Sequence, residues 1–360
     1  FKQVECAMLG KMIKLQEKIT ALAGYELNPG SWVQKNLYFQ SKGIDPVAWN
    51  EDKETGVKTP CWNKDALAQI IDPMANLLVA YTKSNTALST FCRGWVEMAD
   101  ANNIMHPNFK SAGTATGRIS CEHPNMQNPP KWAMHGIIIP EGEIGVKFDY
   151  SQIEYRIFAH YSKDAALLKV YTDNPRVDFH QLLADRLQLG ARDVVKRVNF
   201  GILYGMGRKK LKRTVAKLIH DLRPEPPELG DKDYEKLLIS YPERLDKYEK
   251  LLEFLQYKYG GTLDEIADKI LVEYHQLVPA VKTLLDRVKQ TIHARGNVRN
   301  FFGRYFQFEL DFAYVALNYL CQGTAADLFK NRVNAIFYDR RTIASGAKMV
   351  TNIHDSVLAR

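Results

Sequence analysis

The stretch Arg192-Asp-Val-Val-Lys196-Arg-Val-Asn-Phe200-Gly-Ile-Leu-Tyr204-Gly205 guides the interpretation of the whole chain. Two cations and then two aromatic residues recur in it at every fourth position. This spacing predicts a helix on which the four side chains follow one slowly turning face. Because cations do not belong in a hydrophobic core, this face is not the apolar stripe of a core helix.

A strongly basic run comes next, with seven Lys or Arg residues against one Asp in 208–223. The chain of 360 residues holds 49 Lys and Arg against 41 Asp and Glu, a formal charge of +8. Such an excess suits a polyanionic partner, but a charge run is as often a solvated helix face. Both interpretations of the run remain open at this point.

Composition excludes several classes of protein. A hydrophobic fraction of 46% with 25% charged residues excludes global disorder. No stretch approaches ~20 apolar residues, which excludes a membrane span. The five cysteines are widely spread and form neither a zinc spacing nor a disulfide framework, which favours a reducing cytoplasm. The first residue is Phe1, without an initiator Met, so we expect a longer parent chain.

The segments before and after the basic run differ in pattern. Residues 8–22 predict an amphipathic helix, Ser31 a helix N-cap, and 50–60 a polar loop or exposed hairpin. Residues 136–140 and 145–150 predict two strands, the second ending at Asp149.

The C-terminal half adds two more features. Residues 224–262 are typical of an inserted helical module, with a helix start expected at Ser240-Tyr-Pro-Glu243. Residues 348–360 predict a β-hairpin with His354-Asp355-Ser356 at its tip.

Together these segments resemble DNA polymerase family A. Asp149-Tyr-Ser-Gln-Ile-Glu154-Tyr-Arg156 resembles its motif A, residues 192–205 its motif B, and His354-Asp355 its motif C. Residues 116–120 and 124–128 resemble its primer–template loop, 322–327 its template-side helix and 28–34 its thumb. The segments stand in the family's order along nearly the whole chain.

The resemblance implies an α+β, right-hand polymerase fold with helical thumb and fingers and an antiparallel β-sheet palm. The implied domains are a thumb at 1–100, a first part of the palm with motif A at 101–163, fingers with motif B and the insertion 224–262 at 164–295, and a second part of the palm with motif C at 296–360. The insertion and the form of motif C favour a phage-encoded enzyme.

The implied activity is that of a DNA-directed DNA polymerase that extends a primer with dNTPs. Two Mg²⁺ ions hold the attacking and leaving oxygens in such a reaction, and they prefer carboxylate ligands. The resemblance assigns the metals to Asp149, Asp355 and the backbone carbonyl of Tyr150.

The nucleotide is assigned to residues of motifs A and B. Arg192 and Lys196 would hold the triphosphate with His180, and Lys196 would also protonate pyrophosphate. Phe200 and Tyr204 would stack on the base and sugar. The remaining expected dNTP contacts are Gln152 and Glu154, of which Glu154 is the family's steric gate against a ribose 2′-hydroxyl.

Primer–template DNA is the expected macromolecular partner. Donors in the minor groove meet acceptors that every correct base pair offers, so they test geometry without reading sequence. The residues assigned to DNA are Arg118, Asn125, Gln127, Asn128, Gln322 and His354. We expect a DNA-associated cytoplasmic protein with no membrane partner.

Ser356 departs from the family, which has Glu after His-Asp in motif C. Single-subunit phage-type RNA polymerases carry His-Asp-Ser there, so RNA synthesis is one alternative. A catalytically idle DNA-binding replication protein is another, although the intact Asp149, Asp355, Arg192 and Lys196 oppose it.

Overall fold

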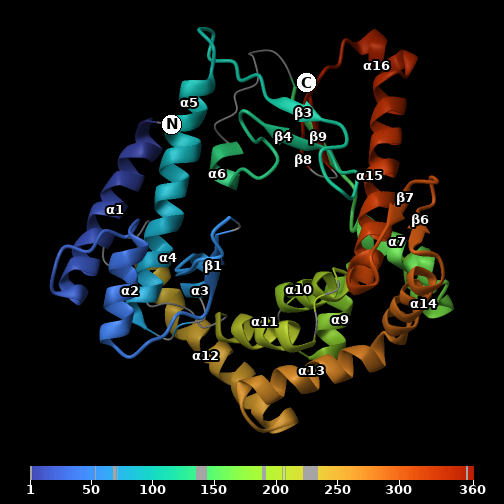
Figure 1. The fold of residues 1–360 in the computed structure, drawn as a ribbon. Coiled ribbons are helices and arrows are strands. Elements are labelled where there is room, and N and C mark those ends of the chain that lie inside the picture. The colour runs from blue at the N-terminus through green and yellow to red at the C-terminus, as the bar shows by residue number, and fades with distance from the viewer. Residues whose placement is uncertain are drawn as a thin grey trace. The chain divides into compact units, whose positions relative to one another are not determined.

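The computed structural model describes residues 2–52, 54–67, 70, 72–134, 144–188, 192–204, 206, 208–221, 234–353 and 356–360. The chain forms two compact units (Figure 1). Unit 1 is Phe1–Phe109 with Cys121–Glu143, and unit 2 is Lys110–Ser120 with Ile144–Arg360. This division into two units does not test the expected boundaries of thumb, palm and fingers, which stay predictions.

Unit 1 is mainly helical. Its largest core packs α1 against α4, and the rings of Phe39 and Trp62 stack in it with centroids 4.6 Å apart. The elements are α1 (Lys2–Ala23), α2 (Trp32–Ser41), β1 (Trp49–Glu51), β2 (Lys58–Pro60), α3 (Lys64–Leu67), α4 (Pro73–Thr86), a π-helix (Ala87–Gly94), α5 (Trp95–Met98) and α6 (Lys131–Met134). The chain passes between the units within β3 (Asn108–Lys110) and β4 (Ser120–Glu122).

Two local predictions in unit 1 are confirmed. The Ser31 side chain accepts a hydrogen bond from the Gln34 backbone N–H and so caps α2. Strands β1 and β2 pair antiparallel, which selects the hairpin rather than the loop for residues 50–60.

Unit 2 contains the sheet that carries motifs A and C. Its strands are β5 (Val146–Asp149), β8 (Met349–Ile353) and β9 (Ser356–Ala359), antiparallel in the order β5-β9-β8. Asp149 pairs with Ser356, and Ile353 pairs with Ser356 across the hairpin. The predicted hairpin and second strand are confirmed, whereas the strand predicted at 136–140 lies outside the described residues.

The helices of unit 2 surround one hydrophobic core. Helix α7 packs against α14 and α15. Two pairs of hydroxyl groups also join α7 to α13 and to α15. Tyr155 and Tyr274 hydroxyls lie 2.7 Å apart, and Tyr161 lies 2.8 Å from the Thr324 hydroxyl. The elements are α7 (Ile153–Ser162), α8 (Ala165–Asp173), α9 (Phe179–Leu187), α10 (Arg192–Leu203), α11 (Arg208–Asp221), α12 (Tyr234–Tyr259), α13 (Leu263–Leu277), α14 (Pro279–Arg295), β6 (Asn297–Arg299), β7 (Tyr305–Gln307), a 3-10 helix (Leu310–Val315), α15 (Ala316–Phe337) and α16 (Arg340–Ser345).

Helix α12 corrects the helix start expected at Ser240. It begins at Tyr234 and runs through Pro242, which lies inside the helix. Proline lacks the N–H of one helical hydrogen bond and is costly there. The preceding residues include Glu235, Lys236 and Leu237, which are strong helix formers, and the helix extends across the single interruption.

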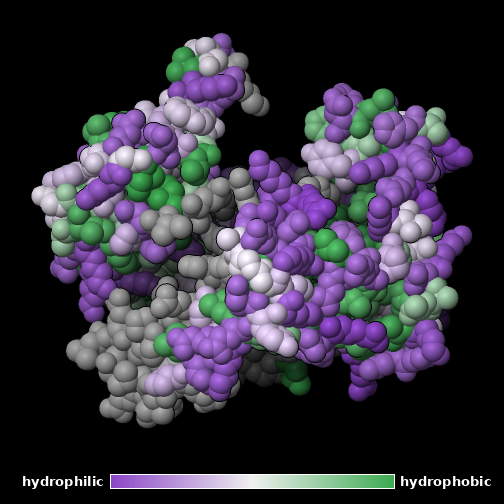
Figure 2. Space-filling view, turned by 90° about the horizontal axis from the view of Figure 1, so that it is seen from below, coloured by the Kyte–Doolittle hydropathy of each residue, from purple (hydrophilic) through white to green (hydrophobic). Residues whose placement is uncertain are grey.

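The surface is mainly hydrophilic on the face shown in Figure 2, where hydrophobic residues form small scattered groups. The buried apolar side chains of the described residues gather mainly in one core of unit 2 and two cores of unit 1. Within the described part of the chain, no helix is long and apolar enough to cross a membrane.

Gly323 on α15 tests the packing of unit 2. A Cβ at this position would overlap the buried Phe306 ring and lie 3.1 Å from the Thr116 carbonyl oxygen. We expect Gly323→Ala to lower the free energy of unfolding by about 1–3 kcal/mol in urea titrations, because ring and backbone must both shift. Gly10→Ala in α1, where nothing lies within 4 Å, is the control and should be neutral or stabilising. Equal stability of both variants would contradict the packing argument.

Candidate active site

The Glu154 carboxylate joins three segments of unit 2. Glu154 lies in the first turn of α7 and is 5% exposed. Arg118 forms an ion pair with its Oε1, and the Tyr204 hydroxyl donates to its Oε2 at 3.0 Å. A buried carboxylate needs such partners, because leaving water costs the charged form several kcal/mol. Burial and then the charge of Glu154 raise the pKa of Tyr204, so its hydroxyl stays protonated and can donate.

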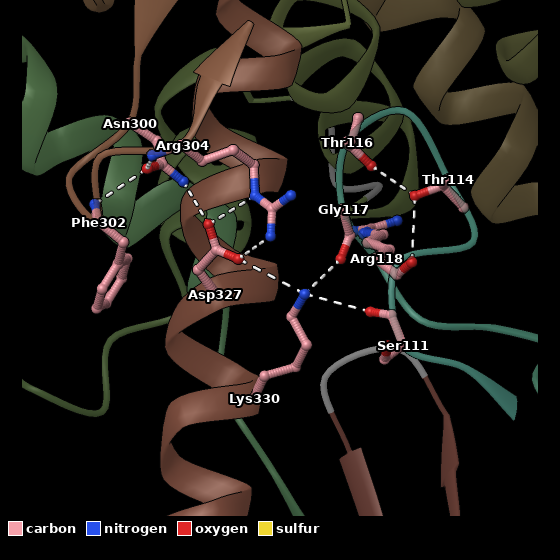
Figure 3. A network of polar contacts seen from close by, with 10 residues as sticks. All are labelled: Ser111, Thr114, Thr116, Gly117, Arg118, Asn300, Phe302, Arg304, Asp327 and Lys330. Atoms are coloured by element: carbon pink, nitrogen blue, oxygen red, sulfur yellow. Dashed lines mark hydrogen bonds and ion pairs between the residues drawn. The ribbon is translucent and has the colours of Figure 1, made fainter.

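The segment that carries Arg118 is fastened to α15 by Lys330, as Figure 3 shows. The Lys330 ammonium donates to the carbonyl oxygens of Gly117 at 2.9 Å and Ser111 at 3.3 Å. Within the segment, the Thr114 hydroxyl donates to the Arg118 carbonyl at 3.3 Å. These bonds fix the backbone on both sides of the residue that reaches Glu154.

Asp327 anchors the other side of this network (Figure 3). Arg304 binds it through two N–H groups, at 2.9 Å and 2.6 Å, and Asn300 donates to it at 2.7 Å. Burial alone would raise the pKa of Asp327, but the hydrogen bonds from Arg304 and Asn300 lower it below the usual value. The carboxylate therefore stays charged opposite Arg304 and Lys330, which lies 3.6 Å away.

Gly117 lets the loop approach Arg304 closely. Its φ is +82°, and a Cβ would lie 2.8 Å from the Arg304 Cζ. Only glycine meets both conditions at low cost. No sequence pattern predicted Arg304 or Lys330 here, and Asp327 was expected only as the last residue of the template-side helix segment 322–327, because no local pattern links the hairpin, α15 and the loop at 111–118.

His180, expected at the triphosphate, is a buried side chain on α9. It is 2% exposed, and Asn199 Nδ2 lies 2.6 Å from its Nδ1. With Asn199 donating, the neutral ring carries its proton on Nε2. Burial lowers the pKa of His180 to about 4, although Asp178 opposes the shift. At neutral pH this side chain is therefore a hydrogen-bond donor without charge.

Helix α10 confirms the four-residue spacing that opened the sequence analysis. Arg192 at its start donates to Asp178 at 2.6 Å, and Lys196 is exposed. The rings of Phe200 and His180 have centroids 5.6 Å apart, and those of Phe200 and Tyr204 5.5 Å. The aromatic half of the face is thus continuous with His180 on α9.

Residues 208–221 of the basic run form α11, and two of its cations have partners within the protein. Arg208 donates to both oxygens of Asp268, at 2.9 and 2.8 Å. Lys212 lies 2.8 Å from Asp264. Both acidic residues belong to α13, so this part of the run holds two helices together.

Motif A places two of the three expected metal ligands, Asp149 and the Tyr150 carbonyl, in the described residues. Asp149 is exposed at the end of β5, next to exposed Tyr150. Carboxylate and backbone carbonyl oxygens are donors that Mg²⁺ prefers, so these groups fit the implied metal. Asp355 and His354 lie outside the described residues. Among the residues that are described, no group of three His, Cys, Asp or Glu could hold a metal.

Gln152 is held by the protein itself. Its backbone φ is +53°, its amide donates to the Val177 carbonyl at 3.0 Å, and its oxygen accepts from the Phe179 N–H at 3.2 Å. These bonds tie the start of α7 to the start of α9. The residue's expected nucleotide contact stays a prediction.

The residues expected to bind DNA divide between the two units. Arg118 and Gln322 belong to unit 2, and Gln322 also forms a side-chain hydrogen bond with Tyr204. Asn125, Gln127 and Asn128 belong to unit 1, where the Asn125 side chain accepts from the Gln127 backbone at 2.9 Å.

Comparisons with known proteins agree with this architecture. A solved structure described as the POL domain of Pol1 from M. smegmatis in complex with DNA primer-template and dNTP matches with a TM-score of 0.68. It is 22% identical, and the match covers 100% of this chain and 59% of that one, so it supports the fold. The fold is therefore the α+β fold of a polymerase domain.

The sequence model of DNA polymerase family A matches residues 1–221 and 255–360, and the chain belongs to this family. The unmatched residues between these ranges cover most of the predicted insertion. DNA polymerase DpoZ of Vibrio phage phiVC8 is 28% identical over 97% of this chain and 54% of its own length. DNA polymerase I of Helicobacter pylori is 25% identical over 99% of this chain and 36% of its own. The chain thus spans about a third to a half of these relatives.

The neutral state of His180 has a measurable consequence. Between pH 6.5 and about 4 the unfolded chain binds a proton here that the folded chain does not, so stability falls as pH falls. We expect His180→Gln to remove about 2–3 kcal/mol of this pH dependence of unfolding, which urea titrations across that range would measure. The exposed His293→Gln is the control. A wild-type pH profile for His180→Gln would contradict a buried neutral His180.

Proposed function

We propose that this chain is a DNA-directed DNA polymerase that extends a primer with dNTPs by two-metal-ion nucleotidyl transfer. The observation that carries the proposal is the pairing of Asp149 with Ser356. It sets the strand that leads into motif A beside the strand that follows motif C, although the two lie more than 200 positions apart. Family membership supports the same conclusion.

Asp149, Asp355 and the Tyr150 carbonyl are proposed to hold two Mg²⁺ ions. The metals would stabilise charge on the attacking and leaving oxygens. The exposed carboxylate of Asp149 at a strand end is open to ligands, and its neighbour in the sheet begins directly after Asp355 in sequence.

The triphosphate is proposed to lie along the start of α10. Lys196 is exposed and offers a mobile ammonium that can bind phosphate and protonate pyrophosphate. Arg192 lies one helical turn before Lys196, and its guanidinium, which donates to Asp178, is proposed to bind the triphosphate with Lys196. His180 would add a neutral Nε2–H donor. Of these three residues, Arg192 and Lys196 would therefore supply the positive charge at the phosphates.

The base and sugar are proposed to lie against Phe200, Tyr204 and Glu154. The Tyr204–Glu154 hydrogen bond closes the space between α10 and α7, where a ribose 2′-hydroxyl would have to fit. Gln152 braces the turn from which Glu154 projects. These contacts fit a gate that selects deoxyribose.

Primer–template DNA is the proposed partner, with dNTPs as substrates. Arg118 has five N–H donors, so engagement with Glu154 leaves others for minor-groove acceptors. Gln322 lies on α15 near the same tyrosine, and Asn125, Gln127, Asn128 and His354 are proposed to add contacts.

The alternative prediction, that the protein synthesises RNA, was based on Ser356 alone. Ser356 is 4% exposed, and its hydroxyl donates to the Ile353 carbonyl at 3.0 Å across the hairpin. This side chain therefore has a local role in the hairpin, which removes the reason to connect it with ribose. An idle DNA-binding protein would not need the buried Glu154 cluster.

Asp149→Asn tests the metal assignment. The change keeps the side chain's size but removes its charge, so we expect at least a hundredfold loss of primer extension. Primer–template affinity should change little, because phosphate contacts dominate it. Asp286→Asn, an exposed carboxylate on α14, is the control and should extend primers as wild type does. Near-normal extension by Asp149→Asn would sink the assignment.

Glu154→Ala tests the gate. Removing the carboxylate opens space beside the sugar, so incorporation of rNTP relative to dNTP should rise roughly tenfold or more. The ratio of the two rates is independent of the fraction of folded protein. Tyr204→Phe keeps the ring but loses the hydrogen bond to Glu154 and should raise the ratio less. An unchanged ratio for Glu154→Ala would place the selection elsewhere.

A further inference from the structure

Unit 2 has a groove between α14, the β6–β7 hairpin and α15, which lie side by side in Figure 1. Its volume is about 730 Å³. Buried Leu284, Val288 and Leu320 supply apolar lining. Exposed arginines supply charge, and no acidic residue occurs among the lining residues that the structure describes.

Three arginines converge on this groove. Arg287 and Arg295 lie two turns apart on one stripe of α14, with Thr291 between them. Arg299 comes from β6, and its guanidinium lies 5.7 Å from the Tyr305 ring centroid. Within the described part of the chain, these arginines form no ion pair. Gathering like charges without an acidic partner is unfavourable unless an anion binds between them.

Exposed aromatic rings continue the groove along the hairpin. Tyr305 is 50% exposed, and Phe301 and Phe302 at the turn are 68% and 45% exposed. The two Phe rings have centroids 5.9 Å apart. A positively charged groove joined to exposed aromatic rings is the combination that binds single-stranded nucleic acid through phosphates and base faces. Base faces in a duplex are already stacked, so these rings favour unpaired nucleotides.

We propose that this surface, the arginine groove with its aromatic turn, binds the single-stranded part of the DNA template. The inference rests on the proposed polymerase function. Leu320 of the groove and Gln322, which is proposed to contact DNA, both belong to α15, two positions apart and therefore on different faces of this helix. Arg287, Arg295 and Arg299 bind the phosphates, and Phe301 and Phe302 stack on the bases.

A pair of matched double variants tests the proposal. Arg287→Gln with Arg295→Gln removes two groove charges, whereas Lys282→Gln with Lys289→Gln removes two charges from the opposite side of α14. Fluorescence anisotropy would compare binding of a primer–template with a long unpaired template and of a blunt duplex, across a salt titration. All four residues are exposed, so folding should be unaffected.

The arginine variant should bind the long-overhang DNA roughly tenfold more weakly, with a salt slope smaller by about 1.4, and bind the blunt duplex as wild type does. Phe301→Ala with Phe302→Ala should weaken the same DNA about fivefold or more without changing the salt slope. Equal losses for arginine and lysine variants, equal losses on both DNAs, or no loss would overturn the proposal. If the wild-type protein did not extend a primer on a short overhang, the proposed polymerase function would be refuted. A measured preference for the long overhang would still support binding of single-stranded DNA by the groove.

Discussion

The buried charge of Glu154 is the constraint on which the rest of the candidate site depends. A carboxylate at 5% exposure is tolerable only with partners, and Glu154 takes them from the loop that carries Arg118 and from Tyr204, directly after α10. The partners are therefore fixed in relation to α7 by electrostatic necessity. Because Tyr204 directly follows the helix that carries Arg192 and Lys196, and its N–H donates to the Phe200 carbonyl, the same contact also orients the residues proposed for the triphosphate.

That constraint extends outward through Arg118. Its loop could not hold the guanidinium at Glu154 unless its own backbone were fixed, and Lys330 does this through the Gly117 and Ser111 carbonyls. Lys330 in turn shares Asp327 with Arg304. Glu154 with Arg118 and Asp327 with Arg304 and Lys330 form two charge clusters. The short loop that carries Gly117 and Arg118 joins them (Figure 3).

Local patterns predicted what depends on local geometry. The spacing of Arg192, Lys196, Phe200 and Tyr204 predicted α10, and the apolar arms around 354–356 predicted the hairpin, because period and turn chemistry are encoded within a few residues. The contact between Lys330 and Gly117 spans 213 positions, and its geometry exists only after packing. The helix start predicted at Ser240 was wrong because the strong helix formers before it outweighed the proline signal. Family resemblance, rather than spacing, brought motifs A, B and C together.

The distribution of charge along α9 and α10 follows from burial rather than from residue type. A histidine beside two cations could have been a third positive group, yet its enclosure and the contact with Asn199 keep it neutral. A third positive charge would repel Arg192 and Lys196, and this repulsion would destabilise the site whenever no substrate is bound. In the proposed triphosphate site, a neutral donor would give the phosphate contact its direction, while the exposed Lys196 would supply charge that water stabilises when no substrate is bound. The three residues proposed to bind phosphate thus divide into one neutral donor and two cations.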